Sequence, residues 1–165
     1  MSAVRKALEA LGHSAGALPE PRLLSDLFVR FQAQVPLRRA PEGFGADEAL
    51  ASWLEDGSGC CGETRVQAFE ALAAGAGFAV EEGQARGASG ECHRVLLAQG
   101  RRVLLDPAFP LPAPLSLVPP AKAESTGYGT LSVRDRGDER FTARAKDRGW
   151  LLQSNLPMGP PEARE

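Results

Sequence analysis

The segment Gly59-Cys60-Cys61-Gly62-Glu63 places a thiol where a helix is expected to begin. The first turn of a helix has unpaired backbone N–H groups and the positive end of the helix dipole, and both favour a thiolate over a thiol. The same N–H groups could stabilise an oxyanion on an attacked carbonyl. The two adjacent cysteines are therefore candidate nucleophiles, although a cysteine is more often a small buried hydrophobe. Gly59 is a candidate substrate-binding residue, because a glycine lets a substrate approach the backbone closely.

A histidine and an aspartate lie on the two arms of a predicted hairpin. Segments 92–98 and 101–106 have strand-like sequences, and the Gln-Gly pair between them suits a two-residue turn. Counted outward from such a turn, the register places His93 directly opposite Asp106, with Cβ atoms about 4.5–5.5 Å apart. At that distance a carboxylate can bind an imidazole N–H and fix its tautomer. A three-residue turn would shift the pairing by one residue and separate the two side chains.

These residue types suggest a Cys–His–Asp triad for acyl transfer through a cysteine thioester. Cys61 is the nucleophile in this hypothesis, His93 the general base and Asp106 the group that orients the imidazole. Strand alternation puts Cys92 on the face opposite His93, so Cys92 is not the expected partner of the histidine.

The elements that must position the triad change in type about halfway along the chain. The first half has helical spacing of apolar residues and helix-ending glycines and prolines, with helices expected from Ser2 to Gly12, from Pro21 to Pro36, from about Asp47, and from about Cys60 to Ala74. The second half has short strand-like segments at 78–86, 92–98, 101–106, 128–134, 139–144 and 149–153.

Helices first and antiparallel strands afterwards predict an α+β fold, in which N-terminal helices, with a central helix that carries the cysteine, pack on an antiparallel sheet. A chain of 165 residues is sufficient for one domain. We expect a single catalytic domain over residues 1–156, helical in 1–76 and sheet in 78–156, followed by a flexible tail at 157–165.

Composition and charge exclude several function classes. Nineteen basic against twenty-one acidic residues give a net charge of −2, so no overall field attracts a nucleic acid. No apolar run approaches the length of a membrane span, and the N-terminus has no signal-peptide core, so a cytoplasmic location is expected. Three cysteines, two of them adjacent, do not form a disulfide framework.

Other interpretations of the conspicuous residues are weaker. Gly75-Ala76-Gly77 does not form a dinucleotide-binding loop, because Val80 stands where the third glycine belongs and the glycines follow a helix. The cysteines and His93 lack the C-x-x-C spacing of a zinc site, so no metal is expected. His13, at the end of the first helix, is expected at the surface.

Several segments together resemble the arylamine N-acetyltransferases, which are relatives of the transglutaminase-like cysteine enzymes. The segment from Gly59 to Glu63 resembles that family's Gly-x-Cys-x-Glu active-site motif, which selects Cys61 over Cys60. The segment at 72–80 is similar to the helix end and Gly-Phe strand that follow the motif. His93 and the residues after it resemble the histidine strand, and residues 106–109 resemble the Asp-x-x-Phe segment. The resemblance extends from about residue 23 to 117.

The resemblance implies a transglutaminase- or papain-like core and a ping-pong reaction. Acetyl-CoA, a cosubstrate and not a bound cofactor, would acetylate Cys61, and a small arylamine or hydrazine would then accept the acetyl group. It also implies that Phe109 contributes to the substrate site. The partners would thus be a small-molecule amine and an acyl donor.

The sequence departs from the family pattern in three places. Arg65 replaces an asparagine, Gly57 lies near the place of an arginine, and Pro110 replaces a glycine. Family members are also longer, with a C-terminal part that helps to shape the coenzyme A cleft. Two alternatives therefore stay open: a transglutaminase-like or amide-hydrolysing enzyme with the same triad, and a non-catalytic binding module on the same scaffold.

Overall fold

The chain divides into two compact units. A computed structural model describes residues 2–16, 18–38, 44–86, 92–100, 102–108, 113–116, 124–126, 129–135, 141–145 and 150–154. Unit 1 comprises Met1–Val80 and Leu105–Pro114, and unit 2 comprises Glu81–Leu104 and Leu115–Glu165. The single catalytic domain stays a prediction, and the tail at 157–165 lies outside the described residues.

Unit 1 contains the four helices that the sequence predicts. They are α1 (Ala3–Ala10), α2 (Pro21–Gln34), α3 (Ala46–Asp56) and α4 (Gly62–Gly75). The Ser2 side chain caps α1 by accepting the Arg5 N–H at 3.4 Å, and Pro21 occupies the first turn of α2. Gly57 ends α3 in the left-handed conformation, with φ +73°.

The fourth helix begins two residues later than predicted. Gly62 is its first helical residue, and Cys61 is the N-cap, with an extended backbone. Cys61 is therefore the last residue before the helix and still lies next to the unpaired N–H groups of its first turn.

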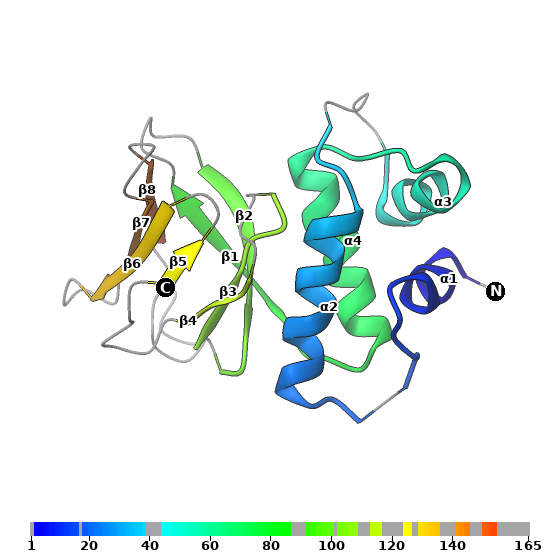
Figure 1. Cartoon of the computed structure of the whole chain (residues 1–165), viewed down its shortest axis with the longest axis horizontal. Helices are drawn as coiled ribbons and strands as arrows, with labels where there is room; N and C mark the ends of the chain where they lie inside the picture. Colours follow the sequence, from blue (N-terminus) through cyan, green and yellow to red (C-terminus); the bar gives the residue numbers. More distant parts are fainter. Residues whose placement is uncertain are drawn as a thin grey trace, which may run out of the picture. The chain divides into compact units, whose positions relative to one another are not determined.

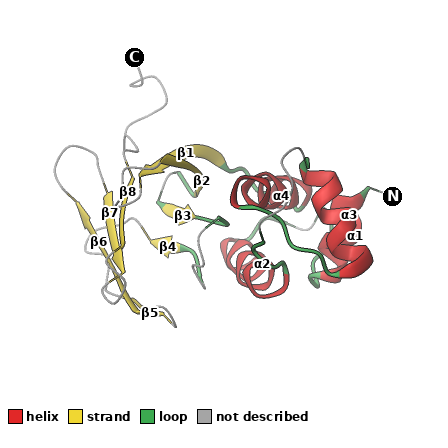
Figure 2. Ribbon diagram, turned by 90° about the horizontal axis from the view of Figure 1, so that it is seen from above, coloured by secondary structure: helices red, strands yellow, loops and turns green. Residues whose placement is uncertain are grey.

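The core of unit 1 forms around α4, which contacts each of the other three helices. Figures 1 and 2 show α2 and α4 side by side. Between them, the Phe69 ring packs edge-on against Phe28 and Phe31, with both centroid separations at 5.3 Å. All three rings are fully buried. These ring contacts join α2 to α4, the helix that has Cys61 at its N-terminus.

Unit 2 is built from one antiparallel sheet with the strand order β4-β3-β2-β1-β8-β7-β6-β5. The strands are β1 (Glu81–Arg86), β2 (Cys92–Ala98), β3 (Val103–Leu105), β4 (Leu115–Ser116), β5 (Glu124–Thr126), β6 (Gly129–Asp135), β7 (Phe141–Ala145) and β8 (Trp150–Ser154). The sheet confirms the predicted α+β class. The sequence did not predict β4 and β5, which have two and three residues.

β1 and β2 form a long hairpin (Figure 1), whose register pairs Glu81 with Leu97 and Ala85 with His93. Residues 95–98 of β2 are all buried, so neighbours cover both faces of this strand. At its end the Arg102 N–H donates to the Ala98 carbonyl oxygen at 3.1 Å. That bond spans three intervening residues, whereas the register derived from the sequence assumed two.

His13 is not the surface residue that the sequence predicts. Its side chain is only 8% exposed, and its Nε2 lies 2.9 Å from Asp26 Oδ2 on α2. The same carboxylate bridges to Arg30, which also donates to the Leu11 carbonyl oxygen. This cluster ties the end of α1 to α2.

Within the described part of the chain, every helix is too short or too polar to cross a membrane.

Candidate active site

Cys61 is a partly exposed thiol at the N-terminus of the central helix. Its Sγ lies 3.0 Å from Thr64 Oγ1, one turn along α4. The Cys61 side chain makes no capping hydrogen bond at the start of α4, although backbone N–H groups of the first turn lie near its sulfur. The thiol at the predicted position of the nucleophile is partly exposed and therefore accessible.

The surroundings of Cys61 lower the pKa of its thiol. The largest cause is the hydrogen bond from the Thr64 side chain, followed by the backbone N–H of Thr64, and the N–H groups of Glu63 and Cys61 add to it. These donors stabilise the charged sulfur, and the slight burial of the thiol opposes them only in part. The position at the start of the helix therefore favours the Cys61 thiolate, as the sequence predicts.

Cys60 is the opposite kind of cysteine. It is 3% exposed, and burial raises the pKa of its thiol to about 11. Its backbone pairs with a neighbouring segment, because its N–H donates to the Pro36 oxygen at 3.1 Å and its oxygen accepts the Arg38 N–H at 3.0 Å. Cys60 is a structural residue, so the chemistry of the environment distinguishes the two cysteines without reference to any family.

Replacing Thr64 by valine should slow the alkylation of Cys61 by iodoacetamide near neutral pH. Valine keeps the shape of this 6% exposed side chain but removes the hydroxyl that hydrogen-bonds to the sulfur. The pKa of Cys61 should rise, so a smaller fraction is thiolate at pH 7 and the second-order rate constant should fall several-fold. At a pH high enough to ionise the Cys61 thiol fully in both proteins, the alkylation rates of wild type and Thr64→Val should converge. Equal rates at pH 7 would contradict the role of Thr64.

Glycines permit close approach of the backbone on both sides of Cys61. A Cβ at Gly59 would lie 2.2 Å from the Pro36 carbonyl oxygen, so the packing of the chain itself requires this glycine. A Cβ at Gly62 would lie 3.2 Å from that of Ala108, so the segment after β3 lies against the start of α4. The substrate-binding role of Gly59 stays a prediction.

Asp106 follows β3 directly and is completely buried. Its Oδ1 accepts the Ala108 N–H at 3.1 Å, a local turn that Pro107 favours by restricting the backbone. Its carbonyl oxygen accepts the Gln32 Nε2 at 3.3 Å. Asp106 belongs to unit 1, as Cys61 does.

His93 and Phe109 are less completely described. The His93 backbone lies in β2, in unit 2, but its side chain is outside the described part of the chain. Phe109 lies outside the described residues altogether. The role of Phe109 therefore stays a prediction. The opposition of His93 and Asp106 also stays a prediction, and it assumed a two-residue turn and not the three-residue span between Ala98 and Arg102.

Arg65, to which the sequence assigned no role, contacts the backbone of Cys61 and of Pro107 within unit 1. It is 3% exposed, and its Nε donates to the Pro107 carbonyl oxygen at 2.6 Å. The one signal in the sequence was its departure from the asparagine of the family pattern, which does not reveal what it contacts.

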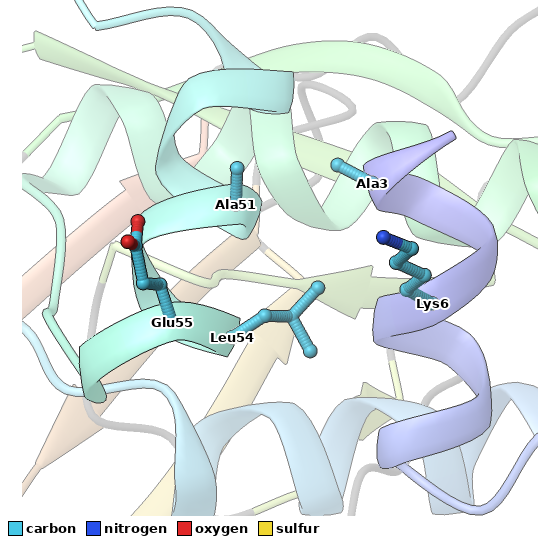
Figure 3. A pocket seen from close by; sticks show the side chains of 5 residues that line it. All are labelled: Ala3, Lys6, Ala51, Leu54 and Glu55. Atoms are coloured by element: carbon cyan, nitrogen blue, oxygen red, sulfur yellow. The ribbon is translucent and has the colours of Figure 1, made fainter. Parts of the chain in front are cut away.

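A separate pocket lies between α1 and α3 in unit 1 (Figure 3). It is lined by Ala3, Lys6, Ala51, Leu54 and Glu55, and thus by none of the predicted site residues. No group of three or more His, Cys, Asp or Glu residues in the described segments is placed to hold a metal ion.

Comparisons with known proteins find similarity in structure alone. No protein-family model matches the sequence, and no curated protein matches it either. The structure is similar to the arylamine N-acetyltransferase from Salmonella typhimurium, with a TM-score of 0.68 and 19% identity, over 98% of this chain and 66% of that one.

Two mycobacterial structures give similar results. For the arylamine N-acetyltransferase from M. tuberculosis the TM-score is 0.63 at 15% identity, over 94% of this chain and 65% of that one. For a variant of the Mycobacterium smegmatis enzyme the TM-score is 0.64 at 18% identity, over 96% and 67%. The chain thus spans about two thirds of the length of these structures. It has the fold of the arylamine N-acetyltransferases.

Proposed function

We propose that this protein is an acyltransferase that moves an acetyl group from acetyl-CoA to an arylamine through a thioester on Cys61. The observation that carries the proposal is the accessible thiol at the start of α4, with a pKa lowered by Thr64 and the first-turn N–H groups. The fold, which it has in common with three proteins named arylamine N-acetyltransferases, supports the choice of acetyl transfer among thiol reactions.

In the first half-reaction, the Cys61 sulfur attacks the carbonyl carbon of acetyl-CoA. The C–S bond to coenzyme A breaks, and coenzyme A leaves as its thiol with the proton that His93 took from Cys61. The backbone N–H groups at the start of α4 are suitable donors to the oxyanion of the tetrahedral intermediate. Cys61 is left as an acetyl thioester.

In the second half-reaction, the amine nitrogen of the acceptor attacks the thioester carbonyl. His93 accepts the amine proton, the C–S bond to Cys61 breaks, and the N-acetyl product leaves. The imidazolium returns its proton to the Cys61 sulfur. The buried Asp106 carboxylate stabilises the cationic imidazole in each half-reaction.

Incubation with acetyl-CoA followed by intact-mass measurement tests the proposal. Wild-type protein should gain one acetyl group, located to Cys61 by peptide mapping, and should lose it when an arylamine such as aniline is added. Cys61→Ala should gain none. An acetyl group on another residue, or none on the wild type, would overturn the proposed reaction.

The same samples separate the two alternatives. Release of acetate instead of an N-acetyl product would indicate a hydrolase with the same triad. A wild-type protein whose Cys61 resists both acetyl-CoA and simple activated esters would indicate a binding module on this scaffold. Both results contradict acetyl transfer.

A further inference from the structure

The backbone of Arg65 closes the first turn of the helix that carries the nucleophile. Its N–H donates to the Cys61 carbonyl oxygen at 2.8 Å. Its side chain then extends into the interior of unit 1, where its guanidinium carbon lies 4.8 Å from the centre of the Phe31 ring. Burial lowers the pKa of Arg65, and the Asp106 carboxylate is among the groups that oppose this shift.

The Arg65 guanidinium bonds to three acceptors in two segments, the end of α2 and the chain after β3. Nε donates to the Pro107 carbonyl oxygen, Nη1 to the Val35 carbonyl oxygen and Nη2 to Gln32 Oε1. The three acceptors are uncharged, so these contacts are not a simple ion pair. They depend on the planar guanidinium, which holds its N–H donors in fixed directions. A lysine ammonium, a single point of charge, does not have this geometry.

Gln32 completes a double hold on the chain around Asp106. While its Oε1 accepts from Arg65, its Nε2 donates to the Asp106 carbonyl oxygen. Arg65 and Gln32 therefore bind the carbonyl groups of two successive residues, Pro107 and Asp106. Both bonds fix the peptide planes from which the buried Asp106 carboxylate projects.

The held segment also lies against the start of α4, since Ala108 is in close contact with Gly62. One side chain thus connects the helix turn after Cys61 to the backbone that bears Asp106. A buried arginine is a poor way to gain stability, because apolar side chains of similar volume often stabilise a protein as well or better. The Arg65 guanidinium instead fixes the backbone of Asp106 relative to the helix turn that follows Cys61.

We propose that Arg65 is a positioning residue, whose guanidinium, together with Gln32, holds the Asp106–Pro107 backbone at a fixed place relative to the helix that carries Cys61. This inference rests on the proposed acyl transfer. Arg65 does not touch the reacting atoms in it. The role belongs to the arginine at this position, where the related motif has an asparagine.

Single-turnover acetylation by saturating acetyl-CoA, followed by quenched-flow intact mass, separates positioning from a purely structural role. In Arg65→Lys, which keeps the charge, the rate constant for acetylation of Cys61 should fall roughly ten- to hundredfold, because small displacements of catalytic groups have effects of that size. The final amplitude should stay that of the wild type. A reduced amplitude with an unchanged rate constant would mean fewer folded molecules only, and would overturn the proposal.

Two further variants keep the test decisive if Arg65→Lys folds poorly. Gln32→Glu retains an acceptor for Arg65 but loses the donor to the Asp106 carbonyl, so its rate constant should fall several-fold at full amplitude. Gln67→Ala is the matched control on α4, where Gln67 bonds only weakly to Glu63 at 3.4 Å, and its rate constant should equal that of the wild type. An unchanged rate constant in Gln32→Glu would contradict the claim that Gln32 and Arg65 together position the Asp106–Pro107 backbone.

Hydrogen–deuterium exchange separates failure of this inference from failure of the proposed function. The amides of Leu105, Asp106 and Ala108 should exchange faster in Arg65→Lys than in the wild type, whatever reaction the protein catalyses. Unchanged exchange at these amides would contradict the claim that Arg65 holds the Asp106–Pro107 backbone. Absence of acetylation in the wild type would instead overturn the proposed function, and with it the role of Arg65 in catalysis.

Discussion

Replacing Cys61 by alanine is expected to abolish acetyl transfer to an arylamine, with a loss of at least roughly 10⁴-fold in kcat/KM. Without the sulfur no thioester can form, and alanine has no group that could substitute for it. The fold should survive, because Cys61 is partly exposed and its side chain does not cap α4. The Thr64 hydroxyl, which bonds to the sulfur in the wild type, keeps the Phe44 carbonyl oxygen as an acceptor at 3.4 Å.

Cys60→Ala is the matched control. Cys60 is buried beside the nucleophile, and removal of its sulfur leaves a small cavity that should cost about 1 kcal/mol of unfolding free energy. Its transfer rate at a temperature well below unfolding should stay within a few-fold of the wild type. Transfer retained in Cys61→Ala, or abolished in Cys60→Ala, would reverse the assignment of the two thiols.

Asp106→Asn should lower kcat by about 10⁴-fold with little change in KM, the size of effect that follows when a nucleophile–His–Asp triad loses its carboxylate. Asparagine keeps the size of the side chain and the oxygen that accepts the Ala108 N–H. It removes the negative charge that would stabilise the His93 imidazolium, and it can hold the ring in the wrong tautomer. Steady-state kinetics with acetyl-CoA and aniline measure both parameters.

Asp56→Asn is the control for a carboxylate outside the site. Asp56 is an exposed residue at the end of α3, where its Oδ1 accepts the Ser58 N–H at 2.8 Å. Its replacement should leave kcat unchanged. A kcat of Asp106→Asn close to that of Asp56→Asn would exclude a catalytic carboxylate at position 106.

The helices and the nucleophile could be predicted because their signals are local. Pro21 and Gly12 mark helix boundaries by their own backbone preferences, so neighbouring residues were enough to locate them. The first-turn position of Cys61 follows from the same reasoning, with an error of two residues at the helix start. The pKa of its thiol depends mainly on groups within one turn, so the sequence also indicated its direction.

Long-range contacts could not be predicted in this way. Arg65 is a charged residue in a helix, which normally indicates solvent, yet its acceptors lie 30, 33 and 42 residues away in the sequence. The prediction for His13 was wrong for the same reason, because its partner Asp26 is on another helix. The strands β4 and β5 are too short to show a two-residue alternation.

The return of residues 105–114 to the helical unit is also a long-range property, since sheet residues precede and follow them in the sequence. The strand pattern correctly placed Asp106 at the end of a strand. It did not indicate that Gln32 and Arg65 would hold the adjoining carbonyl groups. The candidate catalytic residues could thus be predicted from the sequence, but the contacts of Gln32 and Arg65 that position Asp106 could not.

The rate of iodoacetamide alkylation of Cys61 as a function of pH, in the wild type and in His93→Gln, tests the central claim most directly. An activated thiol should react rapidly at pH 7 and keep much of that rate at lower pH, and His93→Gln should slow it several-fold near neutrality. A wild-type profile that rises only as an ordinary thiol ionises, identical to that of His93→Gln, would contradict the claim.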